Sequence, residues 1–161
     1  MLNKKFSEAT VGDVCDCVKD ILSRVVMKDD IRHAIDRMLE NPMSRTVYVM
    51  NDKGKYVGVL NAESILKYLV VQARVEKLGT MVSHRFLMEA LAEEVEDIMV
   101  SARTVKQSDS LSHALAIMFE DHMDGLPVVD DSGLLVGELS CLELFKMGRN
   151  LLDDQKCDCK E

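Results

Sequence analysis

Residues 125–140, "GLPVVDDSGLLVGELS", run from an apolar stretch through a polar turn with glycine into a second apolar stretch that ends in a hydroxyl. Two β-rich runs separated by so few polar residues are typical of an antiparallel hairpin. Residues 46–61, "TVYVMNDKGKYVGVLN", follow the same order earlier in the chain. A hairpin that occurs twice indicates an internal duplication.

The segment before each hairpin is duplicated as well. Residues 29–43, "DDIRHAIDRMLENPM", align with residues 109–123, "DSLSHALAIMFEDHM". Apolar residues recur at helical spacing in both segments, which predicts an amphipathic helix in each. After a slip of one residue in the turn, Gly58 aligns with Gly137. The chain is therefore a tandem repeat.

Each copy is predicted to have the order β-α-β-β-α. The first strands are "RVVMK" (24–28) and "RTVKQ" (103–107), and the last helices span about 62–73 and 141–149. A strand–helix–strand crossover with both helices on one face leaves the other sheet face apolar. The candidate N-cap residues of the first helices are Asp30 in copy one, and Ser108 or Asp109 in copy two.

The repeats divide the chain into four segments. The first repeat covers residues 8–73, the second covers 94–150, and a flexible tail covers 151–161. Residues 74–93 between the repeats are predicted to form a helical connector, with apolar residues at helical spacing and a break near Gly79. The connector has none of the composition of a flexible linker, so we expect rigidly docked halves.

The composition is that of a folded globular protein, with 161 residues, 47% hydrophobic and 30% charged. A net charge of −8 argues against nucleic acid as a partner, because a phosphate backbone requires a basic face. No apolar run reaches the roughly 18 residues of a membrane span, and the first residues lack a secretory signal. We therefore expect a cytoplasmic protein with no membrane partner.

The five cysteines are expected to be reduced thiols, because their number is odd and no export signal precedes them. Cys15 with Cys17, and Cys157 with Cys159, form two C-x-C pairs. Zinc sites more often use C-x₂-C or longer spacings, so no metal site is predicted.

The two copies resemble a tandem pair of cystathionine-β-synthase (CBS) domains over about residues 8–150. The resemblance rests on the order of the elements, on residues 125–140 and on "DIM" at 97–99. It implies an α+β fold in which two β-α-β-β-α repeats pack sheet to sheet about a pseudo-twofold axis and leave two clefts. It also implies a homodimer, regulation of an effector protein, and an adenosine-containing ligand such as AMP, ADP, ATP or S-adenosylmethionine, with no obligatory cofactor.

The ligand motif of that family is a glycine, an apolar residue, a Thr or Ser, and an Asp three residues later. The residues of this chain that align with it are Gly137, Ser140 and Glu143 in copy two, and Gly58, Asn61 and Ser64 in copy one. By the resemblance, the hydroxyl contacts a phosphate or ribose oxygen and the carboxylate binds the ribose diol. Neither copy has the Asp, and only copy two has a carboxylate, so the second site is favoured.

Further contacts are implied beside the motif. The adenine edge would be read by backbone groups near 103–105 and 126–128, with apolar walls around the ring. The candidate residues there are Arg103, Thr104, Leu126 and Pro127, and the candidate cations for a phosphate are Arg103, Arg45, His122 and Arg149.

Each of these residues also has a structural interpretation. Ser140 with Glu143 matches the S-x-x-E capping box, which stabilises a helix start without any ligand, and Asn61 is an ordinary N-cap. Gly58 and Gly137 are equally consistent with close packing. The matching positions of His33 and His113 are explained by the duplication itself.

No nucleophile–base pair, metalloprotease motif or phosphate loop is present, so we do not expect an enzyme. The leading hypothesis is a regulatory module that binds an adenine nucleotide or adenosyl ligand and signals to a partner. The alternative is a ligand-free oligomerisation or docking scaffold with degenerate clefts.

Overall fold

Residues 8–15, 22–41, 45–75, 84–147 and 149 are described by the structure, a computed structural model. Their contacts form two units, which we treat separately. The first-repeat unit is Asp20–Ala102, and the second-repeat unit joins Met1–Lys19 to Arg103–Glu161. The predicted tail (151–161), Gly79, Cys17, Cys157 and Cys159 lie outside the described residues.

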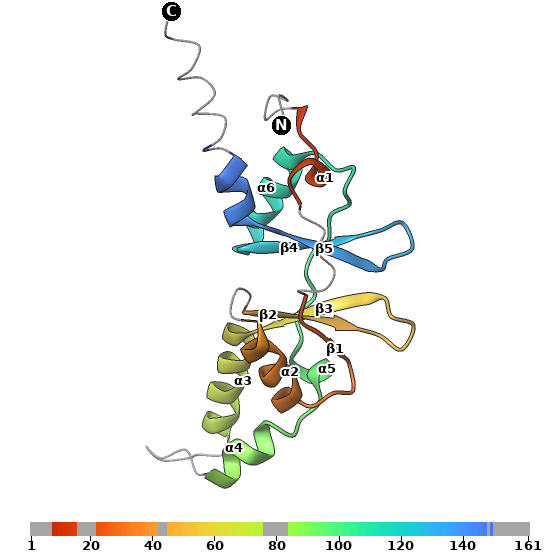
Figure 1. Cartoon of the computed structure of the whole chain (residues 1–161). Coiled ribbons are helices and arrows are strands. Elements are labelled where there is room, and N and C mark those ends of the chain that lie inside the picture. Colours follow the sequence, from red (N-terminus) through yellow and green to blue (C-terminus); the bar gives the residue numbers. More distant parts are fainter. Residues whose placement is uncertain (1–7, 16–21, 42–44, 76–83, 148, 150–161) are drawn as a thin grey trace, which may run out of the picture. The chain divides into compact units, whose positions relative to one another are not determined.

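The first-repeat unit is built on a three-stranded sheet with the order β1-β2-β3 (Figure 1). Strand β1 runs parallel to β2, and β2 runs antiparallel to β3. Mixed strands and helices in this order confirm the predicted α+β class. The elements in chain order are β1 (Arg24–Val26), α2 (Ile31–Glu40), β2 (Thr46–Met50), β3 (Tyr56–Asn61) and α3 (Ala62–Val75).

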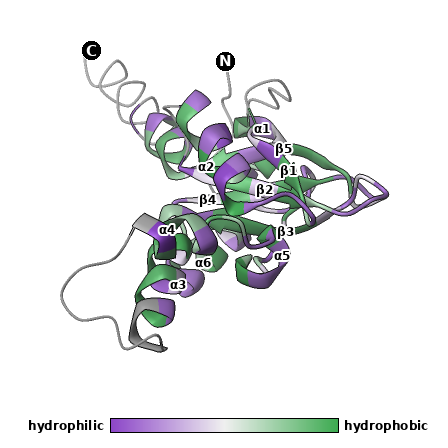
Figure 2. Cartoon of the chain, turned by 90° about the horizontal axis from the view of Figure 1, so that it is seen from below, coloured by the Kyte–Doolittle hydropathy of each residue, from purple (hydrophilic) through white to green (hydrophobic). Residues whose placement is uncertain are grey.

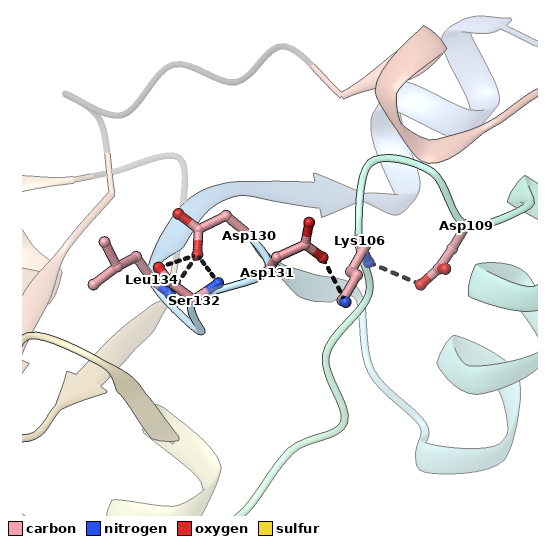
Figure 3. Close-up of polar contacts among 6 residues, drawn as sticks. All are labelled: Lys106, Asp109, Asp130, Asp131, Ser132 and Leu134. Carbon is pink, nitrogen blue, oxygen red and sulfur yellow. Dashed lines mark hydrogen bonds and ion pairs between the residues drawn. The ribbon is translucent and has the colours of Figure 1, made fainter.

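The second-repeat unit contains α6 (Leu111–Asp121), then the hairpin of β4 (Gly125–Val129) and β5 (Leu135–Ser140), and a helical stretch at 141–147. The predicted strand at 103–107 is wrong in extent, because Val105 alone pairs with β4, through Val128. A tight turn ends the pairing: the Asp109 carboxylate accepts a hydrogen bond from the Lys106 N–H at 2.8 Å (Figure 3).

Each unit contains a short helix that, in chain order, comes just before the repeat of the other unit. Helix α1 (Val11–Val14) precedes the first repeat but belongs to the second-repeat unit, where the Val11 N–H donates to the Asp109 carbonyl at 2.9 Å. Helix α5 (Val95–Ile98) precedes the second repeat but belongs to the first-repeat unit, where the Val95 N–H donates to the Asp29 carbonyl at 2.8 Å. Val11 and Val95 are both fully buried.

The connector packs on the first-repeat unit through α4 (His84–Ala90) and the residues after it. The carbonyls of Leu91 and Glu93 accept from the backbone N–H groups of Arg32 and Ile31 at 3.1 and 3.0 Å. These contacts satisfy donors at the start of α2 that have no partner within the helix. Residues 76–83 of the connector lie outside the described ranges.

The first helix of each repeat starts with a side-chain cap. The Asp30 carboxylate accepts from the His33 N–H at 2.7 Å, as predicted. The prediction of Ser108 or Asp109 for α6 is wrong, because Ser110 accepts from the His113 N–H at 3.2 Å. Asp109 instead closes the turn before the helix. Both histidines expose their side chains, and the caps involve only their backbone N–H groups.

The hairpin turns are also held by one side chain each. In the second-repeat unit, a single oxygen of Asp130 accepts from the N–H groups of Ser132 and Leu134, both at 2.9 Å (Figure 3). In the first-repeat unit, Asn51 does the same for Lys53 and Lys55 at 3.0 Å. The Ser132 hydroxyl also donates to this Asp130 oxygen at 2.6 Å, and this bond, together with the backbone N–H groups, lowers the pKa of Asp130.

The two cores use aligned residues, and Figure 2 shows the strands as mainly hydrophobic. The second-repeat core includes Val11, Leu111, Ala114, Leu126 and Leu139, and the first-repeat core includes Ile31, Ala34, Val47, Leu60 and Val95. In the described part of the chain, no helix has the length and apolar character to cross a bilayer.

Candidate functional site

The strand-to-helix turn of the second-repeat unit joins β5 to the helical stretch at 141–147. The Ser140 N–H donates to Glu143 Oε2 at 2.8 Å, and the Glu143 N–H donates to Ser140 Oγ at 3.3 Å. This reciprocal pair is a capping box. Ser140 and Glu143 therefore cap the helix start, as the structural interpretation of these two residues predicts.

The turn of the first-repeat unit joins β3 to α3 with the same reciprocal pattern. The Asn61 N–H donates to Ser64 Oγ at 3.1 Å, and the Ser64 N–H donates to Asn61 Oδ1 at 2.8 Å. The Ser64 hydroxyl also donates to the Asn61 carbonyl at 2.8 Å. This turn is closed entirely by neutral groups.

The two turns differ in what they offer a ligand. A carboxylate has about four acceptor positions, whereas a hydroxyl has one donor and two acceptor positions. Ser64 already uses its hydroxyl as both donor and acceptor within the turn. The two caps therefore differ in one respect: the second includes a carboxylate and the first does not.

The glycine of the first motif is required by the chain itself. A Cβ at Gly58 would lie 2.9 Å from the carbonyl oxygen of Val100 and 3.3 Å from the sulfur of Met99. The segment at Val100 lies close because Val59 and Val100 exchange two backbone hydrogen bonds of 2.9 Å as an isolated bridge. Close packing thus explains Gly58, while Gly137 is buried opposite Val128 in the β4–β5 ladder.

Arg103, the first candidate cation, is engaged by two acidic residues. Its guanidinium donates to both carboxylate oxygens of Asp121, at 2.7 and 2.8 Å, and to Glu120 at 2.8 Å. These bonds raise the pKa of Arg103 and hold the pKa of Asp121 below its usual value. A phosphate at Arg103 would have to compete with these carboxylates.

The backbone groups expected to read an adenine edge are partly paired with each other. The Val105 N–H donates to the Pro127 carbonyl at 3.0 Å, and the Val105 carbonyl accepts from the Val129 N–H at 2.9 Å. Leu126 and Pro127 are buried in β4, whereas the neighbouring Thr104 is exposed. Val105 is thereby committed to the sheet.

Arg45 lies in a different environment from Arg103. It is exposed and lines an apolar groove of about 560 Å³ between α2 and α3. His122 ends α6 with a left-handed backbone (φ 53°) and is exposed, as is Arg149. Of these four candidate cations, Arg103 is the one that belongs to the backbone segment 103–105.

The sequence analysis missed Glu138, which stands in the middle of β5. A Cβ at Gly125 would lie 2.6 Å from Glu138 Oε1, so the glycine leaves room for this carboxylate over β4. The Glu138 carbonyl also accepts from the buried Cys15 thiol at 3.2 Å. The available signal was a charged residue within an otherwise apolar strand.

Tyr56 was also missed. Its hydroxyl donates to the Ala102 carbonyl at 3.3 Å, and its ring is tilted against that of Tyr48, with centroids 6.3 Å apart. Burial, opposed by this hydrogen bond, raises the pKa of Tyr56 to about 12. Tyr56 starts β3, and its hydrogen bond attaches that strand to the segment leaving the unit.

Metal binding finds no support among the residues that the structure describes, where no three His, Cys, Asp or Glu side chains gather. Cys15 is buried and Cys141 is half-buried, both as thiols. The other members of the C-x-C pairs lie outside the described ranges.

Comparison with known families agrees with the architecture. The family model of the CBS domain matches two segments, residues 11–71 and 95–147. The chain belongs to the CBS domain family. The resemblance inferred from the sequence is confirmed, and CBS domain proteins are generally regulatory or binding modules.

Solved structures of other proteins share the fold. A CBS domain-containing protein from Thermotoga maritima is 29% identical, with 84% of this chain and 91% of that chain covered and a TM-score of 0.65. CBSX2 in complex with AMP is 23% identical, with 89% and 98% covered and a TM-score of 0.68. The cytosolic domain of the Mg²⁺ channel MgtE in complex with ATP is 16% identical, with 87% and 49% covered and a TM-score of 0.64.

Proposed function

We propose that this CBS protein is a regulatory module that binds an adenine nucleotide or adenosyl ligand at the second strand-to-helix turn. The observation that carries the proposal is that Ser140 and Glu143 combine a hydroxyl with a carboxylate at a helix start. Helix N-termini favour anionic groups, because their first N–H groups point outward. The AMP and ATP complexes of related folds support an adenine nucleotide as the ligand class.

Each residue has a distinct role in this proposal. Ser140 contacts a phosphate or ribose oxygen, and Glu143 accepts from the ribose diol. Thr104 offers its backbone to the adenine edge, with Leu126 and Pro127 as an apolar wall. Arg103 moves from its carboxylates to the phosphate. Gly137 belongs to the same β5 strand as Ser140, and Gly58, Asn61, Ser64 and Arg45 are the corresponding candidates in the first-repeat unit.

Signalling follows from differential affinity. A ligand that binds one conformation more tightly than another shifts the population toward it. We propose that the output reaches an effector protein through a homodimer of this chain, without catalysis and without an obligatory cofactor. AMP, ADP, ATP and S-adenosylmethionine are the ligands to test.

A thermal-shift series tests ligand binding directly. A ligand at about 100 times its Kd should stabilise the protein by about 2.7 kcal/mol and raise Tm by about 2–8 °C. If none of the four compounds moves the melting curve at millimolar concentration, the proposed function is wrong.

The choice of turn is tested by Glu143→Gln. Glutamine at this position keeps the capping box but removes the charge, so the apo protein should melt nearly as before. We expect nucleotide affinity to fall about tenfold or more, because hydrogen bonds to a charged group contribute about 1.5–3 kcal/mol. Glu63→Gln, at an exposed glutamate in the first turn of α3, is the matched control. Equal losses in the two variants would reject the second turn as the site.

The second candidate function is a ligand-free oligomerisation or docking scaffold. The observation that favours it is that both turns already satisfy their own polar groups. A stable dimer whose melting curve ignores every nucleotide would select this function.

A further inference from the structure

The segment that leads from the first-repeat unit into the second-repeat unit is fixed at both of its ends. At one end, Val100 exchanges two backbone hydrogen bonds of 2.9 Å with Val59 of β3. At the other end, the Val105 N–H donates to the Pro127 carbonyl of β4 at 3.0 Å. Residues 101–104 are the whole length of chain between these two attachments.

Side chains also hold the middle of this stretch. The Tyr56 hydroxyl donates to the Ala102 carbonyl at 3.3 Å, within the first-repeat unit. The next residue, Arg103, donates to Asp121 and Glu120 at 2.7–2.8 Å, within the second-repeat unit. Consecutive Cα atoms are about 3.8 Å apart, so the bond from Tyr56 constrains where the backbone of Arg103 can lie. Arg103 must therefore reach a new partner by rotating its side chain.

The hydroxyl of Tyr56 is not required by the strand that it begins. Tyr56 and Leu135 align in the two repeats, and each pairs with the last residue of the preceding strand. Leu135 is 4% exposed, so an apolar side chain is enough to start the strand. The Tyr56 ring packs against the Tyr48 ring, with centroids 6.3 Å apart, and phenylalanine would keep this ring. The feature that tyrosine alone supplies is the hydrogen bond to Ala102.

We propose that Tyr56 is a positioning residue, which fixes the backbone from which Arg103 reaches a ligand phosphate. The inference rests on the proposed function, in which Arg103 moves from its carboxylates to the phosphate. It adds a residue of the first repeat to a site whose other proposed contacts come from the second. A backbone that is already ordered lowers the entropy cost of binding, so the bond to Ala102 should increase nucleotide affinity.

The variant Tyr56→Phe tests this role by calorimetry with ATP on the full chain. It removes one hydrogen bond and keeps the ring, so ATP affinity should fall about fivefold. Tyr68→Phe is the matched control, because the Tyr68 hydroxyl accepts from the Gln72 side chain at 2.9 Å within α3 of the same unit. The control should bind ATP like wild type. Unchanged affinity in Tyr56→Phe, or an equal loss in the control, overturns the proposal.

A double-mutant cycle distinguishes positioning of Arg103 from a general loosening of the fold. If Tyr56 acts through Arg103, the effects of changing the two residues are coupled. Tyr56→Phe should then cost no further ATP affinity in a chain that already carries Arg103→Gln. Additive losses would show that Tyr56 acts independently of Arg103, and they would overturn the proposal.

Trypsin tests the hydrogen bond to Ala102 without any ligand. Trypsin cleaves after arginine, and the Arg103 side chain is 46% exposed. Cleavage between Arg103 and Thr104, identified from the fragment masses, should be about fivefold faster in Tyr56→Phe than in wild type, because the freed backbone opens more often. Tyr68→Phe should be cleaved there at the wild-type rate. Equal rates in Tyr56→Phe and wild type would contradict the fixed backbone.

The results separate failure of the positioning role from failure of the proposed function. If wild type binds none of the four nucleotide and adenosyl compounds, the proposed function fails and the positioning role fails with it. If wild type binds ATP and Tyr56→Phe binds ATP equally well, the proposed function stands and only the positioning role is overturned.

Discussion

The two strand-to-helix turns show how a duplicated element can keep one role and differ in another. Both turns close a reciprocal cap, Ser140 with Glu143 in the second and Asn61 with Ser64 in the first. The unpaired N–H groups at a helix start impose this requirement on any sequence. A carboxylate is not needed for the cap, and only the second cap uses one as a capping group. The difference separates a backbone requirement from a candidate ligand role.

The segments that precede α2 and α6 also differ in charge. Arg103 of the second-repeat unit aligns with Ser23 of the first, which is buried and donates from its hydroxyl to the Arg37 carbonyl at 3.0 Å. A cation therefore stands beside the second repeat's parallel bridge, where the first repeat has a neutral group. At this position the second repeat carries a charge that the first repeat lacks.

The largest effect is expected from shortening a buried valine in α1 or α5, the two short helices that each pack in the unit of the other repeat. Val11→Ala should destabilise the second-repeat unit by about 2 kcal/mol, because a buried side chain is lost from its core. Val95→Ala should do the same to the first-repeat unit. Hydrogen exchange should show Val11→Ala lowering protection in 111–140, and Val95→Ala lowering it in 31–61. If Val11→Ala instead lowered protection in 31–61 and Val95→Ala lowered it in 111–140, the assignment of α1 and α5 to their units would be wrong.

Weakening the ion pair between Arg103 and Asp121 tests whether the cation of the second repeat binds a phosphate. Asp121→Asn removes the negative charge of the side chain that accepts from Nε and from one terminal nitrogen of the Arg103 guanidinium. If Arg103 binds a phosphate, ATP affinity measured by calorimetry should rise about two- to fivefold, the size expected of an exposed ion pair. Asp131→Asn, at the exposed partner of Lys106, is the control and should leave affinity unchanged. A fall in affinity for Asp121→Asn would count against Arg103 as a ligand.

The smallest expected effect is alkaline loosening of the first-repeat unit. Tyr56 has a pKa of about 12 in the folded chain, against an ordinary value of 10.0. Its neutral form is favoured by folding, so its contribution is complete below about pH 10 and is lost as the pH rises toward 12. The urea midpoint should fall less between pH 9.5 and about 11.5 in Tyr56→Phe than in wild type. Parallel curves for the two proteins would assign the loss to other groups.

Local patterns in the sequence determined most of the fold. The hairpins, the helix faces and the Asp30 cap depend on neighbouring residues, and they were predicted correctly. The capping-box alternative for Ser140 and Glu143 was visible for the same reason. The α6 cap was placed one or two residues early, because Asp109 and Ser110 are both good caps by type. Only the turn closed on Lys106 distinguishes them.

Tertiary structure alone decided the remaining features. The exchange of α1 and α5, the carbonyl over Gly58, the carboxylates on Arg103 and the groove beside Arg45 all join residues far apart in the chain. Spacing along a sequence reports which side chains share a face of one element. Which element lies against that face depends on packing in three dimensions. For this reason the sequence identified Arg103 as a candidate cation but did not show that two carboxylates pair with it in the fold.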